Sequence, residues 1–123
     1  MAATADIVLA DYSAANKTFT PSVAVSNGNQ YADTSSTVAS PRSLTVKHVL
    51  LPASAQTGVE VHSLAFAHTA VDSVSGKMYT VSVTLTFRVP RTGPTLGNRR
   101  DLWTFTKNFL TDTNIEKLLI GGF

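Results

Sequence analysis

The chain has 123 residues, of which 43% are hydrophobic and 15% charged, and its formal net charge is +2. This composition excludes a disordered chain and predicts a single folded domain over residues 1–123. The absence of cysteine excludes a disulfide framework and a thiolate nucleophile. No apolar run approaches the roughly 18 residues of a transmembrane helix, and the N-terminus lacks the basic start of a signal peptide. We therefore expect no membrane partner and a location in the cytoplasm.

The charge is unevenly distributed along the chain. Residues 34–100 hold seven basic and two acidic side chains, a local net charge of +5, whereas the rest of the chain carries −3. A basic middle is typical of a face that binds a polyanion. Ordinary solvated lysines and arginines would give the same count, so charge alone does not decide between the two interpretations.

Short β-branched runs at residues 6–10 and 17–25 predict an N-terminal β-hairpin within about residues 1–26. Pro21 should interrupt or end the second of these strands, because proline has no N–H to donate to a ladder. The dipeptide Asn27-Gly28 then predicts a turn into a short strand within QYADTSS.

The clearest strand is MYTVSVTLTFRV, residues 78–89. From Tyr79 on, its odd-numbered positions are apolar, and its even-numbered positions carry hydroxyls or Arg88, so one face should be packed and the other polar. The same alternation is fainter in RSLTVKHVLL, residues 42–51. These patterns predict an antiparallel sheet over residues 27–90.

The segment VEVHSLAFAHTAV, residues 59–71, also predicts a strand, but its faces stay unassigned. Its first two valines fall on the opposite parity from Leu64 and Phe66. A bulge near Ser63, or burial of both faces, would explain this pattern.

Two short helices are predicted over residues 98–120, after prolines that end the sheet. Asn98 can cap the first helix, with Asp101 in its first turn. Thr113 and Glu116 have the spacing of a capping box for the second helix, and Gly121-Gly122 would stop it.

The order of hairpin, antiparallel sheet and helices predicts an α+β fold. Two short helices cannot cover the apolar face of five long strands, so a partner chain should supply helices of its own. The large apolar side chains of the helices are the candidate dimer interface: Leu102, Trp103, Phe105, Phe109 and Leu118. The aromatic members of this group could instead form a stacking platform for single-stranded RNA.

Six strings in this order resemble the coat proteins of single-stranded RNA bacteriophages of the levivirus type. They are IVLAD, KTFTP, YADTSS, SLTVKHV, YTVSVTLTFRVP and DLWTFTKNFLTDTNIEKLLIGGF, and together they run from one end of the chain to the other. The resemblance implies an N-terminal hairpin, a five-stranded antiparallel sheet and two C-terminal helices that interlock with a partner subunit. A dimer would then make one ten-stranded sheet. Any inter-subunit disulfides of such relatives are absent here, because the chain has no cysteine, and the short connections leave the strand count open.

The resemblance also implies a structural role in a virion assembled in the cytoplasm of the bacterial host. Its partners would be a second copy in a homodimer, further dimers in an icosahedral capsid, single-stranded genomic RNA and the phage maturation protein. The dimer would also bind an RNA hairpin near the replicase start and repress replicase translation. No cofactor is expected.

Carried over by position, the resemblance places RNA contacts on the face that alternation makes polar. The RNA-binding candidates are Thr45, Lys47, Ser82, Thr84, Thr86 and Arg88. Hydroxyls can hydrogen-bond bases, while lysine and arginine neutralise phosphates. If this face is plain solvated surface, the next candidate is the basic group of Arg91, Arg99 and Arg100.

No pattern of residues supports catalysis. His48, His62 and His68 with Glu60 match no zinc spacing, since only Glu60 and His62 clearly share a strand face. The glycine-rich segment 93–98 lacks the Gly-Lys-Ser/Thr of a phosphate loop, and there is no nucleophile elbow. We therefore expect no enzyme, no catalytic residues and no metal ligands. The alternatives to a coat protein are a non-assembling β-rich RNA-binding protein and a pilin-like subunit, which the missing signal peptide disfavours.

Overall fold

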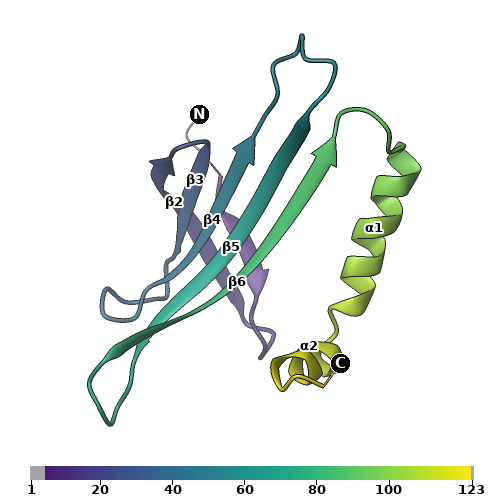
Figure 1. Ribbon diagram of the computed structural model, residues 1–123. Helices are drawn as coiled ribbons and strands as arrows, with labels where there is room; N and C mark the ends of the chain where they lie inside the picture. Colours follow the sequence, from purple (N-terminus) through teal and green to yellow (C-terminus); the bar gives the residue numbers. More distant parts are fainter. Residues whose placement is uncertain (1–4, 123) are drawn as a thin grey trace.

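The computed structural model describes residues 5–122, which form an antiparallel sheet and two C-terminal helices (Figure 1). The strands are β1 (Ile7–Ala10), β2 (Asn16–Val25), β3 (Gly28–Asp33), β4 (Arg42–Val49), β5 (Val59–Val71) and β6 (Met78–Pro90), and the helices are α1 (Leu96–Phe109) and α2 (Asp112–Leu119). Every strand pairs with its neighbours in the chain, in the order β1 to β6. The expected α+β class is confirmed. Neither helix is long and apolar enough to cross a membrane.

The sheet has six strands in the described part of the chain, so the expectation of five is wrong. The N-terminal hairpin is not a separate unit beside the sheet. Strand β2 runs for ten residues and pairs with β1 on one side and β3 on the other, which makes the hairpin the first two strands of the sheet.

Pro21 does not end β2, and the reason lies in which edge its nitrogen faces. The Thr18 carbonyl accepts a hydrogen bond from the Thr34 N–H at 3.0 Å, so the backbone groups of Thr18 face β3 and those of Phe19 and Pro21 face the opposite edge. On that edge β1 pairs only as far as Phe19. The missing N–H of Pro21 therefore breaks no ladder bond, and the strand continues after a register shift between Pro21 and Val23.

The predicted turn before β3 is present. Asn27 adopts a left-handed φ of 63°, and Gly28 is the first residue of β3. A Cβ added to Gly28 would lie 1.8 Å from the Val46 carbonyl oxygen of β4. Only glycine allows this close approach of two backbones, so Gly28 fixes where β3 meets β4.

Strands β5 and β6 pair without interruption from Val59 opposite Pro90 to Val71 opposite Met78. The bulge suggested near Ser63 is therefore absent. Continuous register assigns the faces of β5: Leu64 and Phe66 lie on the face of Leu85 and the other apolar residues of β6, and Val59 and Val61 lie on the opposite face.

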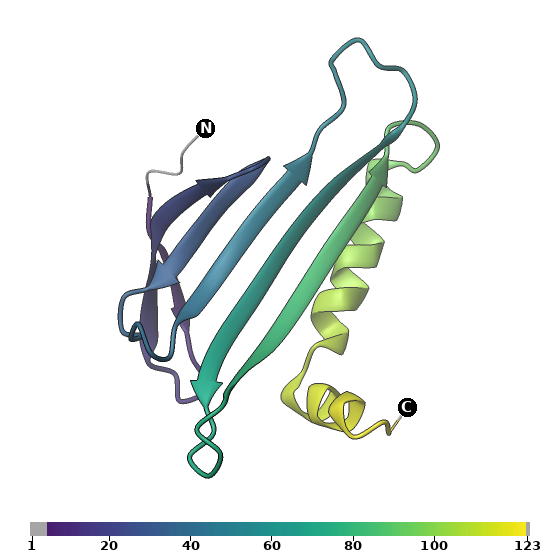
Figure 2. The same cartoon turned by 60° about the vertical axis from the view of Figure 1, so that its left-hand side comes forward.

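The buried core lies in the first five strands. Phe19, Tyr31 and Leu44 are the buried apolar residues of the described chain, and Ile7, Val46, Leu64 and Phe66 pack around them. The rings of Phe19 and Phe66 meet edge to face, 5.9 Å apart. The sheet is strongly curved (Figure 2).

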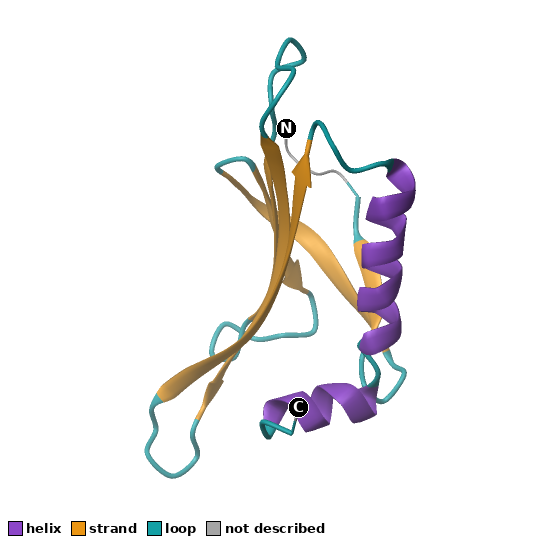
Figure 3. Ribbon diagram, turned by 45° about the vertical axis from the view of Figure 1, so that its right-hand side comes forward, coloured by secondary structure: helices purple, strands orange, loops and turns teal. Residues whose placement is uncertain are grey.

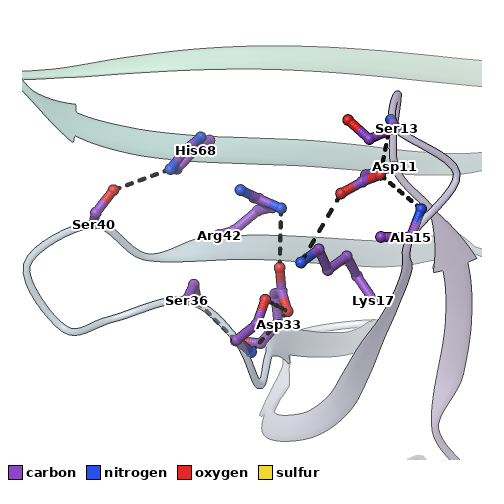
Figure 4. A network of polar contacts seen from close by, with 10 residues as sticks. Asp11, Ser13, Ala15, Lys17, Asp33, Ser36, Ser40, Arg42 and His68 are labelled. Carbon is purple, nitrogen blue, oxygen red and sulfur yellow. Dashed lines mark hydrogen bonds and ion pairs between the residues drawn. The ribbon is translucent and has the colours of Figure 1, made fainter.

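A buried carboxylate joins β3 to β4 beside this core. Asp33 is 2% exposed and accepts hydrogen bonds from Arg42 at 3.1 Å and from the Ser35 hydroxyl at 2.8 Å (Figure 4). Burial acts to raise the pKa of Asp33, but the hydrogen bonds from Ser35 and the charges of Arg42 and Lys17 outweigh it and hold the pKa below its ordinary value.

Both helices begin earlier than predicted. Thr95, not Asn98, caps α1: its hydroxyl accepts from the Asn98 N–H, and the Asn98 side chain accepts from the Thr95 N–H. Thr111, not Thr113, caps α2 by accepting from the Asn114 N–H. Each cap is formed by a threonine three residues ahead of an asparagine, whereas the predicted caps stood three residues ahead of an acidic residue.

Neither helix packs onto the sheet of its own chain. None of the residues of α1 or α2 is buried. Figure 3, which views the sheet nearly edge-on, shows both helices on one side of it and set apart from it. The apolar face near β6 is thus left uncovered by the chain's own helices, as the helix lengths predicted.

Candidate functional site

The two faces of the sheet differ in chemistry, and the strand register defines them. Directly opposed residues of antiparallel strands project their side chains to the same face. We call one face the hydroxyl face; it carries Ser43, Thr45 and Lys47 of β4, Ser63, Ala65 and Ala67 of β5, and Ser82, Thr84, Thr86 and Arg88 of β6. The other is the apolar face, with the core and the helices.

All six RNA-binding candidates lie on the hydroxyl face, in rows that cross the strands. Thr45 is opposite Ala65, which is opposite Thr84. In the next row, Lys47 is opposite Ser63, which is opposite Thr86. With strands about 4.8 Å apart, residues on β4 and β6 in one row lie about 10 Å from each other. The structure therefore brings two segments, 39 residues apart in the chain at Thr45 and Thr84, onto one surface.

The side chains of this surface are available to a ligand. Ser82, Thr84, Thr86, Arg88 and Lys47 are exposed, and Thr45 is half-buried. Among residues 5–122 neither Lys47 nor Arg88 has an ion-pair partner. The face thus offers two free cations and several hydroxyls in one plane.

Further polar residues belong to the same surface. Ser43 follows from alternation in its own strand, but Gln30 and Ser63 could not be found from single strands. Gln30 lies opposite Thr45, and Ser43 lies opposite Ala67, which faces Ser82. Ser63 completes the row of Lys47. Placing Gln30 and Ser63 requires the register between strands, which one strand's sequence does not contain.

The alternative basic group is not assembled as a free patch. The Arg91 guanidinium donates to the carbonyls of Pro52 and Ala55 at 2.8 and 2.7 Å, and it forms an ion pair with Glu60 at 2.8 Å. Arg91 thereby holds the loop between β4 and β5. Arg99 lies half-buried on α1, facing β6, with its Nε atom buried and without a partner in the described chain.

The interface candidates are exposed apolar side chains on the helices. Leu102 is 68% exposed, Phe105 66% and Leu118 53%, while Trp103 and Phe109 are less open. An open cavity of about 740 Å³ separates α1 from β6. Its apolar lining comes from both elements: Leu85, Phe87 and Val89 of β6, and Leu96, Leu102, Trp103 and Phe105 of α1.

The outer edge of β6 is also open. This 13-residue strand pairs with β5 alone in the described chain, and Figure 2 shows it at the margin of the sheet beside α1. On its apolar face Tyr79, Val81 and Val83 are 59%, 67% and 64% exposed. A long unpaired edge with exposed apolar residues is a template for pairing with another chain.

The histidines are closer together than the sequence indicated. His48 lies directly opposite His62, so Glu60 and His62 are not the only members of this group that share a face. His68 lies apart from them and is hydrogen-bonded to the Ser40 hydroxyl at 3.0 Å (Figure 4). No group of three or more His, Cys, Asp or Glu side chains in the described chain is arranged to hold a metal ion.

Neither a protein-family model nor a curated protein matches the sequence. Solved structures do match its fold. The virus-like particle of bacteriophage ESE058 gives a TM-score of 0.72 at 21% identity, over 94% of each chain. The virus-like particle of Beihai levi-like virus 21 gives 0.63 at 19% identity, over 93% of this chain and 91% of the other. The coat protein of bacteriophage EMS014 gives 0.64 at 20% identity, over 85% and 72%. The antiparallel sheet followed by two C-terminal helices, which the resemblance implied, is confirmed, whereas its five-stranded count is wrong and the interlocking with a partner stays a prediction.

Proposed function

We propose that this chain, which has the fold of levi-like virus and bacteriophage shell subunits, is a coat protein of a small single-stranded RNA bacteriophage. Its role would be structural, with no catalytic step. The observation that carries the proposal is the likeness over almost the whole length of both chains to subunits of closed particles. The open edge and the uncovered helices agree with it, because both require other copies of the chain.

The first assembly step would be a dimer. The free edge of β6 can pair with the β6 edge of a second copy related by a two-fold axis, since an antiparallel pair is self-complementary. Because each chain contributes six strands, the joint sheet would have twelve strands and not the ten expected from the resemblance. This pairing would remove the most exposed edge of the monomer.

The helices would complete the same dimer. The cavity of about 740 Å³ beside α1 is lined by Leu96, Leu102, Trp103 and Phe105 of that helix and is large enough to receive several side chains. A partner lying across this space would bury apolar groups that the monomer leaves in water, and burial of such groups is the main favourable term in association. The interface would include Leu102, Phe109 and Leu118.

The hydroxyl face would line the inside of the shell and bind RNA. Lys47 and Arg88 have no ion-pair partner and can neutralise phosphates. Thr45, Ser82, Thr84 and Thr86 can donate to and accept from bases and sugars in single-stranded RNA. The small Ala65 between Thr45 and Thr84 leaves room for a flat base above the sheet.

The finer roles rest on the sequence resemblance. They are binding of an RNA hairpin near the replicase start, repression of its translation, contact with a maturation protein, and assembly into virions in the host cytoplasm. A hairpin-binding assay with the purified dimer tests the first of these directly.

Expression of the untagged chain in bacteria tests the proposal. We expect closed, uniform particles by electron microscopy that sediment as one peak and contain RNA. Dimers alone, across a range of salt and pH with RNA supplied, would contradict the coat protein and favour a non-assembling RNA-binding protein. A folded monomer that binds no RNA would contradict both.

A further inference from the structure

Two imidazole rings meet where β4 and β5 pair, on the apolar face. The Nδ1 atoms of His48 and His62 lie 2.8 Å apart, with the rings edge to face and their centres 5.1 Å apart. In the neutral pair one ring donates a hydrogen to the other, so both nitrogens are directed at the same small volume. Side chains from two strands thus present two potential metal donors to one point.

The remaining ring nitrogen of His62 lies near a carboxylate, at a distance longer than a hydrogen bond. Its Nε2 atom lies 3.7 Å from the Glu60 carboxylate. Glu60 is itself held by Arg91 at 2.8 Å. A carboxylate beside one ring nitrogen favours the hydrogen on that nitrogen, which leaves the lone pair of the other nitrogen free for a metal. Here Nε2 faces the carboxylate and Nδ1 faces His48.

We propose that His48 and His62 form a two-nitrogen chelate for a divalent transition-metal ion, with Cu²⁺ or Ni²⁺ favoured over Zn²⁺. With metal–nitrogen bonds of about 2.0 Å, two nitrogens 2.8 Å apart subtend about 90° at the ion. This is the angle between neighbouring ligands in the square-planar or tetragonal sites of Cu²⁺ and Ni²⁺. A tetrahedral Zn²⁺ site would need the nitrogens about 3.3 Å apart.

Water can reach the pair and complete the coordination. His48 is exposed, and the side chain of His62 is 32% exposed. No third protein ligand is in place in the described chain, so water would occupy the remaining positions. When the ion binds, the hydrogen between the rings would move from Nδ1 to Nε2 of His48, so that both rings stay neutral and both Nδ1 lone pairs bind the ion. The ion would link the ends of β4 and β5 close to the loop that Arg91 holds. His62 also lines the cavity between β6 and α1, so the site requires that a partner in the proposed dimer leaves both rings open to water.

Calorimetric titration of the untagged protein with CuSO₄ and NiCl₂ tests the chelate. We expect one ion per chain for the wild type and at least tenfold weaker binding for His48→Ala and for His62→Ala. His68→Ala is the matched control, because His68 is bonded to Ser40 and lies apart from the pair. Equal affinity of the wild type and the His48→Ala variant, or loss of binding in His68→Ala, would overturn the proposal.

A spectroscopic measurement on the wild type guards against a variant that fails to fold, and one further variant and a comparison of metals test the geometry. The electron paramagnetic resonance spectrum of Cu²⁺ bound to the wild type should show two nitrogen ligands in a tetragonal site, and a spectrum with one nitrogen or none would overturn the proposal. Glu60→Gln removes the charge behind His62 and should weaken binding about tenfold or more, as loss of such outer partners does. Tighter binding to Zn²⁺ than to Cu²⁺ would contradict the assigned geometry.

Discussion

The two ends of the sheet hold similar kinds of side chain in opposite environments. At the β1–β4 end, Phe19 and Leu44 are each 4% exposed, and the buried Asp33 is paired with Arg42. At the β6 and helix end, Leu102 and Phe105 are 68% and 66% exposed, and none of the residues of either helix is buried. The chain packs the β1–β4 end within itself, and we call this the closed end. It leaves the β6 and helix end exposed, and we call this the open end.

This difference shows which part of the fold each chain stabilises alone. The curved sheet gives the β1–β4 end its own core, so its stability should be independent of protein concentration. The helices lie beside the sheet with no buried residue, so they gain little from burial in the monomer. Isolated helices of 14 and 8 residues are marginal in water, so a second copy should be needed to keep them folded.

The largest effect is expected from Phe19→Ala at the closed end. Phe19 is buried and meets Phe66 edge to face, so its removal deletes a large core side chain that cannot be replaced by a partner. We expect a loss of about 3–5 kcal/mol in the free energy of unfolding, measured by urea denaturation. The loss should be the same at low and high protein concentration. A loss that depends on protein concentration would show that the closed end is not stabilised by one chain alone.

A somewhat smaller effect is expected from Trp103→Ala at the open end. Trp103 is already 38% exposed, so part of its surface lies against its own chain and the rest would be buried by a partner. We expect the dimer to weaken by about 3 kcal/mol, seen as monomer in analytical ultracentrifugation. Val38→Ala, at a side chain that is 99% exposed in the loop before β4, is the control and should leave the dimer intact. Stable, folded wild-type monomers would contradict the interlocked dimer.

Asp33→Asn should cost about 2 kcal/mol, because it leaves Arg42 without its charged partner. The pKa of Asp33 is lower in the folded chain than its ordinary value, so the ionised carboxylate stabilises the fold above about pH 4, and this contribution is lost as the pH falls further. Unfolding measured from pH 6 to pH 2.5 should show a steeper loss of stability for the wild type than for Asp33→Asn. Parallel curves would show that Asp33 does not stabilise the closed end through its charge.

The sequence predicted the closed end less well than the open one. Strict alternation in 78–89 predicted β6 and its two faces, and helical spacing predicted the apolar side of α1, because each pattern lies within one segment. Pro21 was expected to interrupt or end β2. It interrupts the register with β3 but does not end the strand, because its nitrogen faces the edge where β1 no longer pairs. The helix starts were misplaced by two or three residues because threonine caps act through backbone groups that alternation does not reveal.

The candidate sites were also predicted where the pattern lies within one strand and missed where it depends on pairing between strands. The six residues of the hydroxyl face were selected from two strands of clear alternation, together with the resemblance to coat proteins. Gln30 and Ser63 were missed because the register between strands sets their position. The contact of His48 with His62 was missed for the same reason: the two histidines belong to different strands and meet through pairing alone.

A smaller effect than those on folding is expected from Thr84→Val on the hydroxyl face. The change keeps the shape of the side chain and removes its hydroxyl, so any base or sugar group that it contacts loses a hydrogen bond. We expect about 1–2 kcal/mol weaker binding of a preferred RNA hairpin and little change for a scrambled RNA. Thr80→Val on the same strand is the control, because Thr80 is bonded to Thr69 outside the two central rows. Equal effects of both changes would show that the Thr84 hydroxyl does not help to recognise the preferred RNA hairpin.

The smallest effect is expected from Lys47→Ala, and it should differ in kind. Lys47 has no ion-pair partner in residues 5–122 and shares a row with Thr86, so its charge is free to meet a phosphate. Its loss should weaken hairpin and scrambled RNA by the same modest factor and reduce the salt dependence of binding by about one counterion. Titrations at two or more salt concentrations separate the loss of a charge in Lys47→Ala from the loss of a hydroxyl in Thr84→Val. The second change should leave the salt dependence of RNA binding unchanged. Lys77→Ala is the matched control, since Lys77 lies in the turn before β6, beyond the two central rows. An unchanged salt slope for Lys47→Ala would mean that RNA does not cross this face at Lys47, and Arg99 and Arg100 would then be the cations to test.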